Sequence, residues 1–331
     1  MEHDLLSPSQ EPVLIPEQAA VQETPLNVDS AVPKNTRLFF YGILATAAAV
    51  FIIGGTIAVY ARAFSDEWAA RVASVAPFPA AFVSGRPVWL GNFLFEYKGM
   101  RTYYNQNASG ALTEEDDASL RKNVLDALVR RVIVNRIALD ESVYLTEEAV
   151  ESAQAGMIPS DTPAEKLAED VDRLFGWDVE AFRDHLVRPV ALEKFLNERL
   201  IMDRYLQEGP RKQIDNAFVR LQRGEAFAEV AKSVNEAGSV PEDGAIGKVS
   251  VESLPSEVAA AINGLKDGEY SPIVEIGAQN DWAFYIIRMN GQEEKDAKLV
   301  VDLSVIRVKK MTLDDLVNQK LERAVIWRIV S

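Results

Sequence analysis

The feature that most constrains this chain of 331 residues is a run of 23 residues without a charge, from Leu38 to Tyr60. As an α-helix, a run of this length measures roughly 34 Å, which exceeds the bilayer core of about 30 Å. Buried helices of globular proteins seldom stay this long with nothing more polar than threonine and tyrosine. The run therefore predicts a single transmembrane helix at residues 37–61.

The charged residues around this run do not predict its orientation in a membrane. Lys34 and Arg37 precede it, while Arg62 and Arg71 follow it, so the positive-inside rule favours neither orientation. Residues 1–36 are rich in proline, glutamate and glutamine, which predicts a disordered tail.

Composition excludes several kinds of chemistry. The chain has no cysteine and only two histidines, which leaves no material for disulfides, a thiol nucleophile or a zinc site. The formal net charge is −15, and the chain has no basic stripe long enough to bind a nucleic acid. We therefore expect no cofactor, no metal and no nucleic-acid partner.

The first half of the remaining chain reads as helical. Residues 80–90 form the exception, because Ser84-Gly85-Arg86-Pro87 is a turn signal between two short apolar segments. Thr113 precedes an acidic first turn, which is typical of a helix start. Apolar residues then recur at every fourth position from Leu120 to Val132. Residues 91–206 are predicted to be almost wholly helical.

After Gly209-Pro210, which marks a boundary, the pattern changes. Short segments with helical apolar spacing begin at Ile214, Phe227 and Val258. They alternate with turn clusters and with apolar segments that favour strands. This mixture predicts an α+β fold for the second half of the chain.

Residues 211–291 also carry four motifs in a fixed order: Arg223–Ala231 (RGEAFAEVA), Asp243–Gly247 (DGAIG), Leu254-Pro255 with Ala261–Val274, and Ala283–Arg288 (AFYIIR). In order and spacing they resemble the parvulin-type (PpiC-like) peptidyl-prolyl isomerases. Upstream, Ala81–Val88 (AFVSGRPV), Val124–Val129 and Leu145–Val150 are similar to segments of SurA- and PrsA-type chaperone domains.

The resemblance implies a membrane-anchored, extracytoplasmic folding factor of the cytoplasmic membrane, with the N-terminus inside and the bulk of the chain outside. Its partners would be unfolded or secreted client polypeptides, and the lipid bilayer through residues 38–60. The expected parts are a disordered cytoplasmic tail (1–36), a transmembrane helix (37–61), a juxtamembrane helix (62–76), a SurA/PrsA-like helical chaperone domain (77–208), a degenerate parvulin-like domain (209–310) and a C-terminal helix (311–331). That last helix has an apolar face, which either packs on the helical domain or forms a homodimer contact.

The polar groups that the family uses are replaced here. Parvulins place two histidines and a cysteine or aspartate beside an apolar proline pocket. The histidine of the closing strand corresponds to Tyr285, and the cysteine or aspartate position falls on Ala237. The first strand, which carries the other histidine, is missing before Arg211, where the preceding helix leaves no room for it.

That strand has a candidate replacement later in the chain. Asp302–Lys309 (DLSVIRVK) resembles the missing strand, and Leu299–Val308 is apolar on both faces, which is typical of a central strand. A hairpin through Asn290-Gly291 and the acidic loop that follows would place it antiparallel to Phe284–Met289. We therefore predict a circularly permuted sheet, with Val305 at the histidine position.

The resemblance implies client binding at Leu254, Val258 and Phe284. With the polar positions degenerate, we expect a folding factor that binds unfolded or proline-containing chains with weak or no isomerase catalysis. Two alternatives remain open: an active peptidyl-prolyl cis-trans isomerase, and a non-catalytic structural membrane subunit.

Overall fold

The computed structural model describes residues 34–107, 112–159, 161–278, 281–295 and 298–330. They divide into two units, residues 1–57 and 58–331, and each is considered by itself. The predicted tail at 1–36 lies almost entirely outside the described residues. In the first unit, the described residues belong to α1 (Lys34–Arg62), whose Tyr41, Val50 and Ile53 side chains are exposed.

The predicted transmembrane helix is wrong. Among the described residues, no helix combines the length and the apolar character that crossing a membrane requires. The prediction relied on length and on the absence of charge. Much of the run is alanine, glycine and threonine, as at 45–49 and 54–56, and these residues favour transfer into hydrocarbon far less than leucine or isoleucine does.

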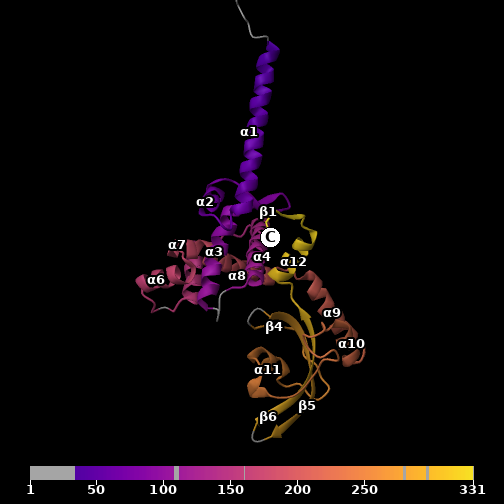
Figure 1. The fold of residues 1–331 in the computed structure, drawn as a ribbon. Helices are drawn as coiled ribbons and strands as arrows, with labels where there is room; N and C mark the ends of the chain where they lie inside the picture. The colour runs from indigo at the N-terminus through magenta and orange to yellow at the C-terminus, as the bar shows by residue number, and fades with distance from the viewer. Residues whose placement is uncertain (1–33, 108–111, 160, 279–280, 296–297, 331) are drawn as a thin grey trace, which may run out of the picture. The chain divides into compact units, whose positions relative to one another are not determined.

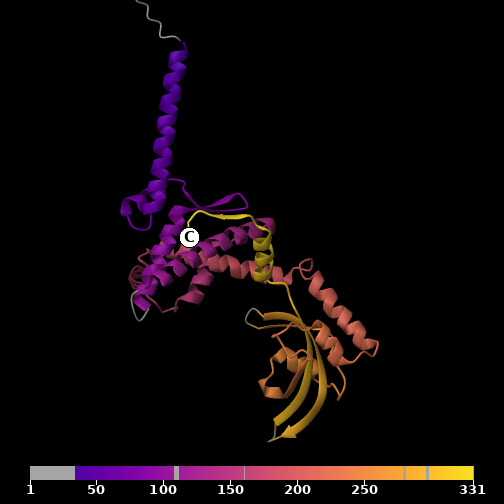
Figure 2. The same cartoon turned by 45° about the vertical axis from the view of Figure 1, so that its right-hand side comes forward.

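The second unit begins with the last turn of α1, from Ala58. α2 (Glu67–Val75) follows and ends just before Pro77, and a three-stranded antiparallel sheet has the order β2-β1-β7. β1 (Pro79–Val83) and β2 (Arg86–Trp89) form the predicted hairpin. Its turn places both Ser84 and Gly85 at positive φ, as a tight two-residue hairpin requires. Figure 2 shows β7 (Ile326–Arg328), from the far end of the chain, beside β1.

The helical expectation for residues 91–206 is confirmed. The elements are α3 (Leu90–Asn107), α4 (Glu114–Asp140), α5 (Glu147–Met157), α6 (Ala164–Phe175), α7 (Val179–Phe182), a π-helical turn (Arg183–Val187) and α8 (Arg188–Met202). Thr113 caps α4 through a reciprocal capping box with Asp116. Leu125, Val129 and Ile137 of α4 are buried in the core that α4 shares with α3, α8 and β1.

The α+β part contains α9 (Glu208–Gln222), α10 (Phe227–Val234), β3 (Ala245–Ser250), a 3₁₀ turn (Val251–Ser253), α11 (Ser256–Ile262), β4 (Val274–Ala278), β5 (Asp281–Lys295) and β6 (Lys298–Lys309). Its sheet is antiparallel in the order β3-β6-β5-β4. Gly209-Pro210 lies in the first turn of α9, so the boundary falls slightly earlier than predicted. Proline is tolerated there because first-turn amides have no partner within the helix.

Helices cover both faces of this sheet, with α9 and α10 on one side and α11 on the other (Figure 1). Side chains alternate along β6 accordingly. Ile306 and Val308 pack under α9 and α10, whereas Leu303 and Val305 pack on the α11 side. Apolar character on both faces is what a doubly covered strand needs.

The predicted central strand is therefore confirmed: β6 pairs antiparallel with β5, and Ile286 lies opposite Ile306. The predicted connection through Asn290-Gly291 and the acidic loop is shorter than expected, because β5 continues past Asn290-Gly291 to Lys295 and β6 begins at Lys298. Asn290 instead sits at a bulge, and the register resumes with Gly291 opposite Asp302. Beyond the bulge the two strands stay paired as far as Lys295, which lies opposite Lys298.

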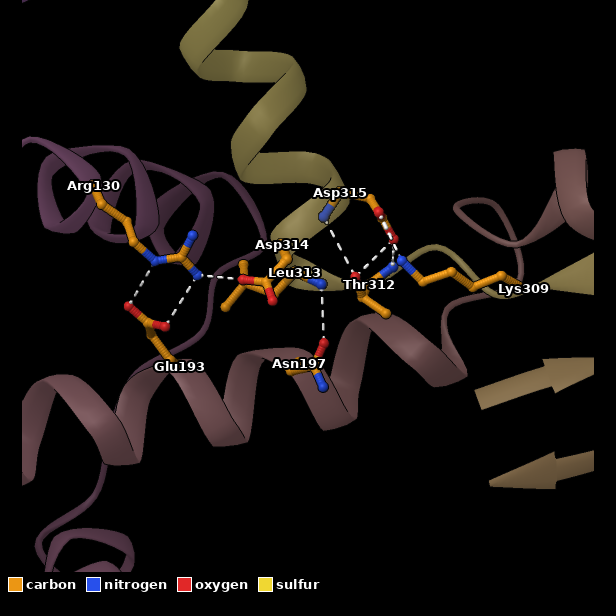
Figure 3. Close-up of polar contacts among 8 residues, drawn as sticks. All are labelled: Arg130, Glu193, Asn197, Lys309, Thr312, Leu313, Asp314 and Asp315. Carbon is orange, nitrogen blue, oxygen red and sulfur yellow. Dashed lines mark hydrogen bonds and ion pairs between the residues drawn. The ribbon is translucent and has the colours of Figure 1, made fainter. Parts of the chain in front are cut away.

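After β6 the chain returns to the helical part. The predicted C-terminal helix is α12 (Leu313–Arg323); it ends earlier than expected and is followed by β7. It packs on α4 and α8. Figure 3 shows Arg130 of α4 joined to Glu193 of α8 and to Asp314 of α12, while Asn197 of α8 accepts from the backbone N–H of Leu313.

Candidate functional site

Four of the sequence-predicted site residues meet on the α11 face of the four-stranded sheet. Leu254 and Val258 flank the start of α11, and both are half-buried against the same core cluster as Tyr285 of β5. Val305 of β6 lies in the same cluster and is only 8% exposed. Tyr285 is opposite Arg307, two residues from Val305, so Tyr285 and Val305 are diagonal neighbours on one face.

Ala237, the third expected polar position, lies in an exposed turn beside β6. Two residues earlier, the Asn235 side chain accepts from the Arg307 backbone N–H at 2.8 Å and donates to the Val305 carbonyl at 3.2 Å. Gly244 continues this contact, because its carbonyl accepts from the Val305 N–H. Hydrogen bonds from this loop therefore hold β6 at Val305 and Arg307, where none of the described strands pairs with it on that side.

Phe284 does not join this site. It is 2% exposed and packs under α9 and α10, on the opposite face of the sheet. There its ring lies against the cations of Arg211 and Lys310. Because successive residues of a strand point to opposite faces, Phe284 and Tyr285 cannot both face α11.

The structure adds a residue that the sequence reasoning missed. The Arg307 side chain is 5% exposed and donates from Nε to the Tyr285 hydroxyl at 3.0 Å. Its guanidinium also lies 5.9 Å from the centre of the Tyr285 ring. The available signal was the strand period, because Arg307 shares a face with Val305 and the hairpin register brings it opposite Tyr285.

This arrangement offers a specific chemistry. The apolar side chains of Leu254 and Val258 can contact a proline ring. When its oxygen accepts from Arg307, the Tyr285 hydroxyl can still donate its own proton to a carbonyl. The described residues hold no group of histidine, cysteine, aspartate and glutamate that could bind a metal ion. The site therefore provides apolar contact and hydrogen-bond donors on one face.

Comparison with known proteins agrees with this geometry. Residues 203–290 match a family model described as "Rotamase: PPIC-type PPIASE domain". A search of curated proteins found no significant match to the chain. The matched residues end at Asn290, so β6 lies beyond them although it is central in the sheet. Residues 203–290 thus supply both helical layers and three strands of the fold, and the chain is a protein with a parvulin-type PPIC domain.

Proposed function

We propose that this chain is a parvulin-type folding factor that binds proline-containing segments of unfolded client chains on the α11 face, with weak or no isomerase activity. One observation carries the proposal. The half-buried apolar residues Leu254 and Val258 are retained beside Tyr285, whereas Val305 and Ala237 occupy positions where the family resemblance expects polar groups.

Binding and catalysis make different demands on this site. Binding needs apolar area for the proline ring and donors for the client backbone, and both are present. Catalysis must lower a barrier of about 18–20 kcal/mol to rotation about the prolyl bond. The buried methyl groups of Val305 can neither donate nor accept a hydrogen bond, so Tyr285 with Arg307 is left as the polar group of the site.

Two assays on the full chain test the proposal. In a prolyl-peptide assay we expect a rate close to the uncatalysed one, because positioned acid–base groups contribute typically about 10²–10⁴-fold where enzymes use them. In an aggregation assay with an unfolded protein, we expect stoichiometric suppression. Turnover at a rate typical of parvulins would overturn the first expectation, and failure to suppress aggregation would overturn the second.

A matched pair of variants locates the binding surface. Val258→Asp places a carboxylate in the half-buried cluster and should abolish both suppression and binding of a proline-rich peptide. Val219→Asp, at an exposed position of α9, introduces the same change away from the site and should leave both intact. Equal behaviour of the two variants would exclude the α11 face as the client site.

A further inference from the structure

A second exposed surface lies on a different sheet from the proposed client site, and the proposed function does not use it. Among the described residues of the second unit, the three-stranded sheet β2-β1-β7 is covered on one face, where Ala81, Val83 and Val88 are buried against the helical core. On the outer face, Phe82 lies directly between Pro87 and Trp327 in the strand register. Trp327 is 69% exposed.

The apolar character continues past this row. Val325 and Ile329 share the outward direction of Trp327, because side chains alternate along an extended chain. They are 63% and 47% exposed, and Trp89 of β2 is 41% exposed. The outer face thus presents six apolar side chains, two of them tryptophan: Phe82, Pro87, Trp89, Val325, Trp327 and Ile329.

The charged residues in the segments that build this sheet have one sign, and by strand alternation Arg86 and Arg328 start from the side of Val83 and Ile326, at the margin of the outer face. Residues 77–91 and 323–330, which build the sheet and its margins, contain Arg86, Arg323 and Arg328 and no acidic residue. Arg328 reaches Asp126 of α4 and is partly neutralised by it. In a chain with a net charge of −15, this is a local cationic margin around an apolar face.

We propose that the outer face of β2-β1-β7 docks on an anionic lipid surface. Tryptophan is enriched where protein meets the headgroup layer, since its ring is apolar and its N–H is polar. Arginines beside such residues are attracted to anionic headgroups. The face therefore combines the apolar, aromatic and cationic groups that a lipid headgroup layer recognises, and it makes a peripheral contact through a sheet.

A second copy of the chain fits this face less well. Three strands about 4.8 Å apart, with three to five residues each rising about 3.3 Å, cover roughly 200 Å². A stable interface typically buries about 800 Å² on each partner. Face-to-face pairing of two copies would also bring the arginines of both sheets together, and this like-charge contact opposes association.

A local probe tests the proposal on the full chain. The sequence has no cysteine, so Val325→Cys offers a single thiol for an environment-sensitive fluorophore on the outer face, and it leaves both tryptophans in place. Tyr205→Cys is the matched control, at an exposed side chain between α8 and α9. The local readout matters because α1 of the same chain exposes apolar side chains, so sedimentation with vesicles would not identify the contact.

Equimolar phosphatidylglycerol and phosphatidylcholine vesicles should shift the label at 325 to the blue, and spin-labelled acyl chains should quench it. The label at 205 should respond to neither. Arg86→Gln and Arg323→Gln should each weaken the partitioning roughly fivefold at low salt. Vesicles of phosphatidylcholine alone should give a weaker response than the anionic vesicles.

Three results would overturn the proposal. The first is an equal response at 325 and 205, or none at 325, with anionic vesicles. The second is a shift at 325 that appears without lipid as protein concentration rises, which would identify a second copy as the occupant. The third is a shift produced by an unfolded protein without lipid, which would identify a client surface.

Discussion

The two sheets of this protein both include a strand from the C-terminal segment, but they differ in how many of their faces are covered by helices. The four-stranded sheet is covered by helices on both faces, and its central strand β6 is apolar on both sides. The three-stranded sheet is covered on one face and leaves two tryptophans exposed on the other. Each sheet is nevertheless completed by the same C-terminal segment, which supplies β6 to one and β7 to the other.

This comparison shows that the last part of the chain ties the two halves of the second unit together. Between β6 and α12, the buried Lys310 amine contacts the Glu275 carboxylate and the Ile201 carbonyl. The Gln207 side chain, at the entry to the α+β part, both accepts from and donates to the Met311 backbone. The segment that enters the α+β part is thus hydrogen-bonded to the segment that leaves it.

The largest expected effect comes from removing this segment. A chain ending at Lys295 loses β6 from the interior of its sheet, which exposes both apolar layers that β6 separates. We expect no cooperative unfolding transition for the α+β part by calorimetry or circular dichroism. A chain ending at Arg323 loses only β7 and should retain that transition. An unchanged melting temperature in the chain that ends at Lys295 would show that β6 is not needed for the four-stranded sheet.

The next effect compares one side chain from each sheet. Ile306→Ala deletes a fully buried side chain of β6 and should lower the free energy of unfolding by about 2–5 kcal/mol. Trp327→Ala removes a larger but mostly exposed side chain from β7 and should cost about 0.5 kcal/mol or less. Urea titrations of both variants measure the difference. Equal costs would mean that the outer face of β7 is covered after all.

A pair of glycines sharpens the role of the loop beside β6. Gly244 has φ +78°, and a Cβ there would lie 2.4 Å from the Val305 carbonyl oxygen. Gly247 has φ +84° with open space around it. Gly247→Ala should cost about 1 kcal/mol from the left-handed backbone alone, and Gly244→Ala clearly more because backbone atoms must move. Thermal unfolding of both variants measures the two costs in stability. Equal costs would mean that the backbone near Gly244 moves to accept a Cβ without further loss.

The smallest effect concerns the anchoring of α12. Burial of Asp315 opposes its ionisation, yet hydrogen bonds from Thr312 and Lys309 outweigh this and hold the pKa of Asp315 below its ordinary 3.8. The ionised form therefore stabilises the fold above about pH 4, and this stability is lost as the pH falls through the folded-state pKa. The cap should contribute about 1 kcal/mol.

Comparing the wild-type chain with Asp315→Asn isolates this contribution. The difference in free energy of unfolding should be constant from pH 7 to about 5 and should vanish at lower pH. A difference that persists below the folded-state pKa would show that the charge of Asp315 is not its source. Glu322→Gln, at an exposed position near the end of the same helix, serves as the control for a general change in charge.

Much of the fold followed from periodicity. The helices of residues 91–206 and the placement of β6 were correct because their apolar spacing reflects burial directly, on one stripe for a helix and on two faces for a central strand. The motif order also identified the domain that the family model matches at 203–290. The transmembrane helix was wrong, since absence of charge did not measure how strongly the run prefers hydrocarbon.

The structure brings together four of the residues predicted for the site and places Phe284 on the opposite face of the sheet. Leu254, Val258, Tyr285 and Val305 share the α11 face, but Phe284 was assigned to it against the period of two. Arg307 was missed because the strand period places it on the face of Val305 but does not show which residue lies opposite. Its meaning depends on which residue lies opposite, and that is set by a hairpin register running through a bulge at Asn290.

The sequence by itself determined the helical periods, the turn at Ser84-Gly85 and the order of the parvulin-type motifs, because these depend on neighbours within a few residues. Only the tertiary structure decided the Tyr285–Arg307 hydrogen bond and the pairing of β7 with β1. A three-residue strand is too short for its alternation to be distinguished from chance. It exists because β1 offers an open edge at that point in space, and no local pattern encodes a distance of more than 200 residues along the chain.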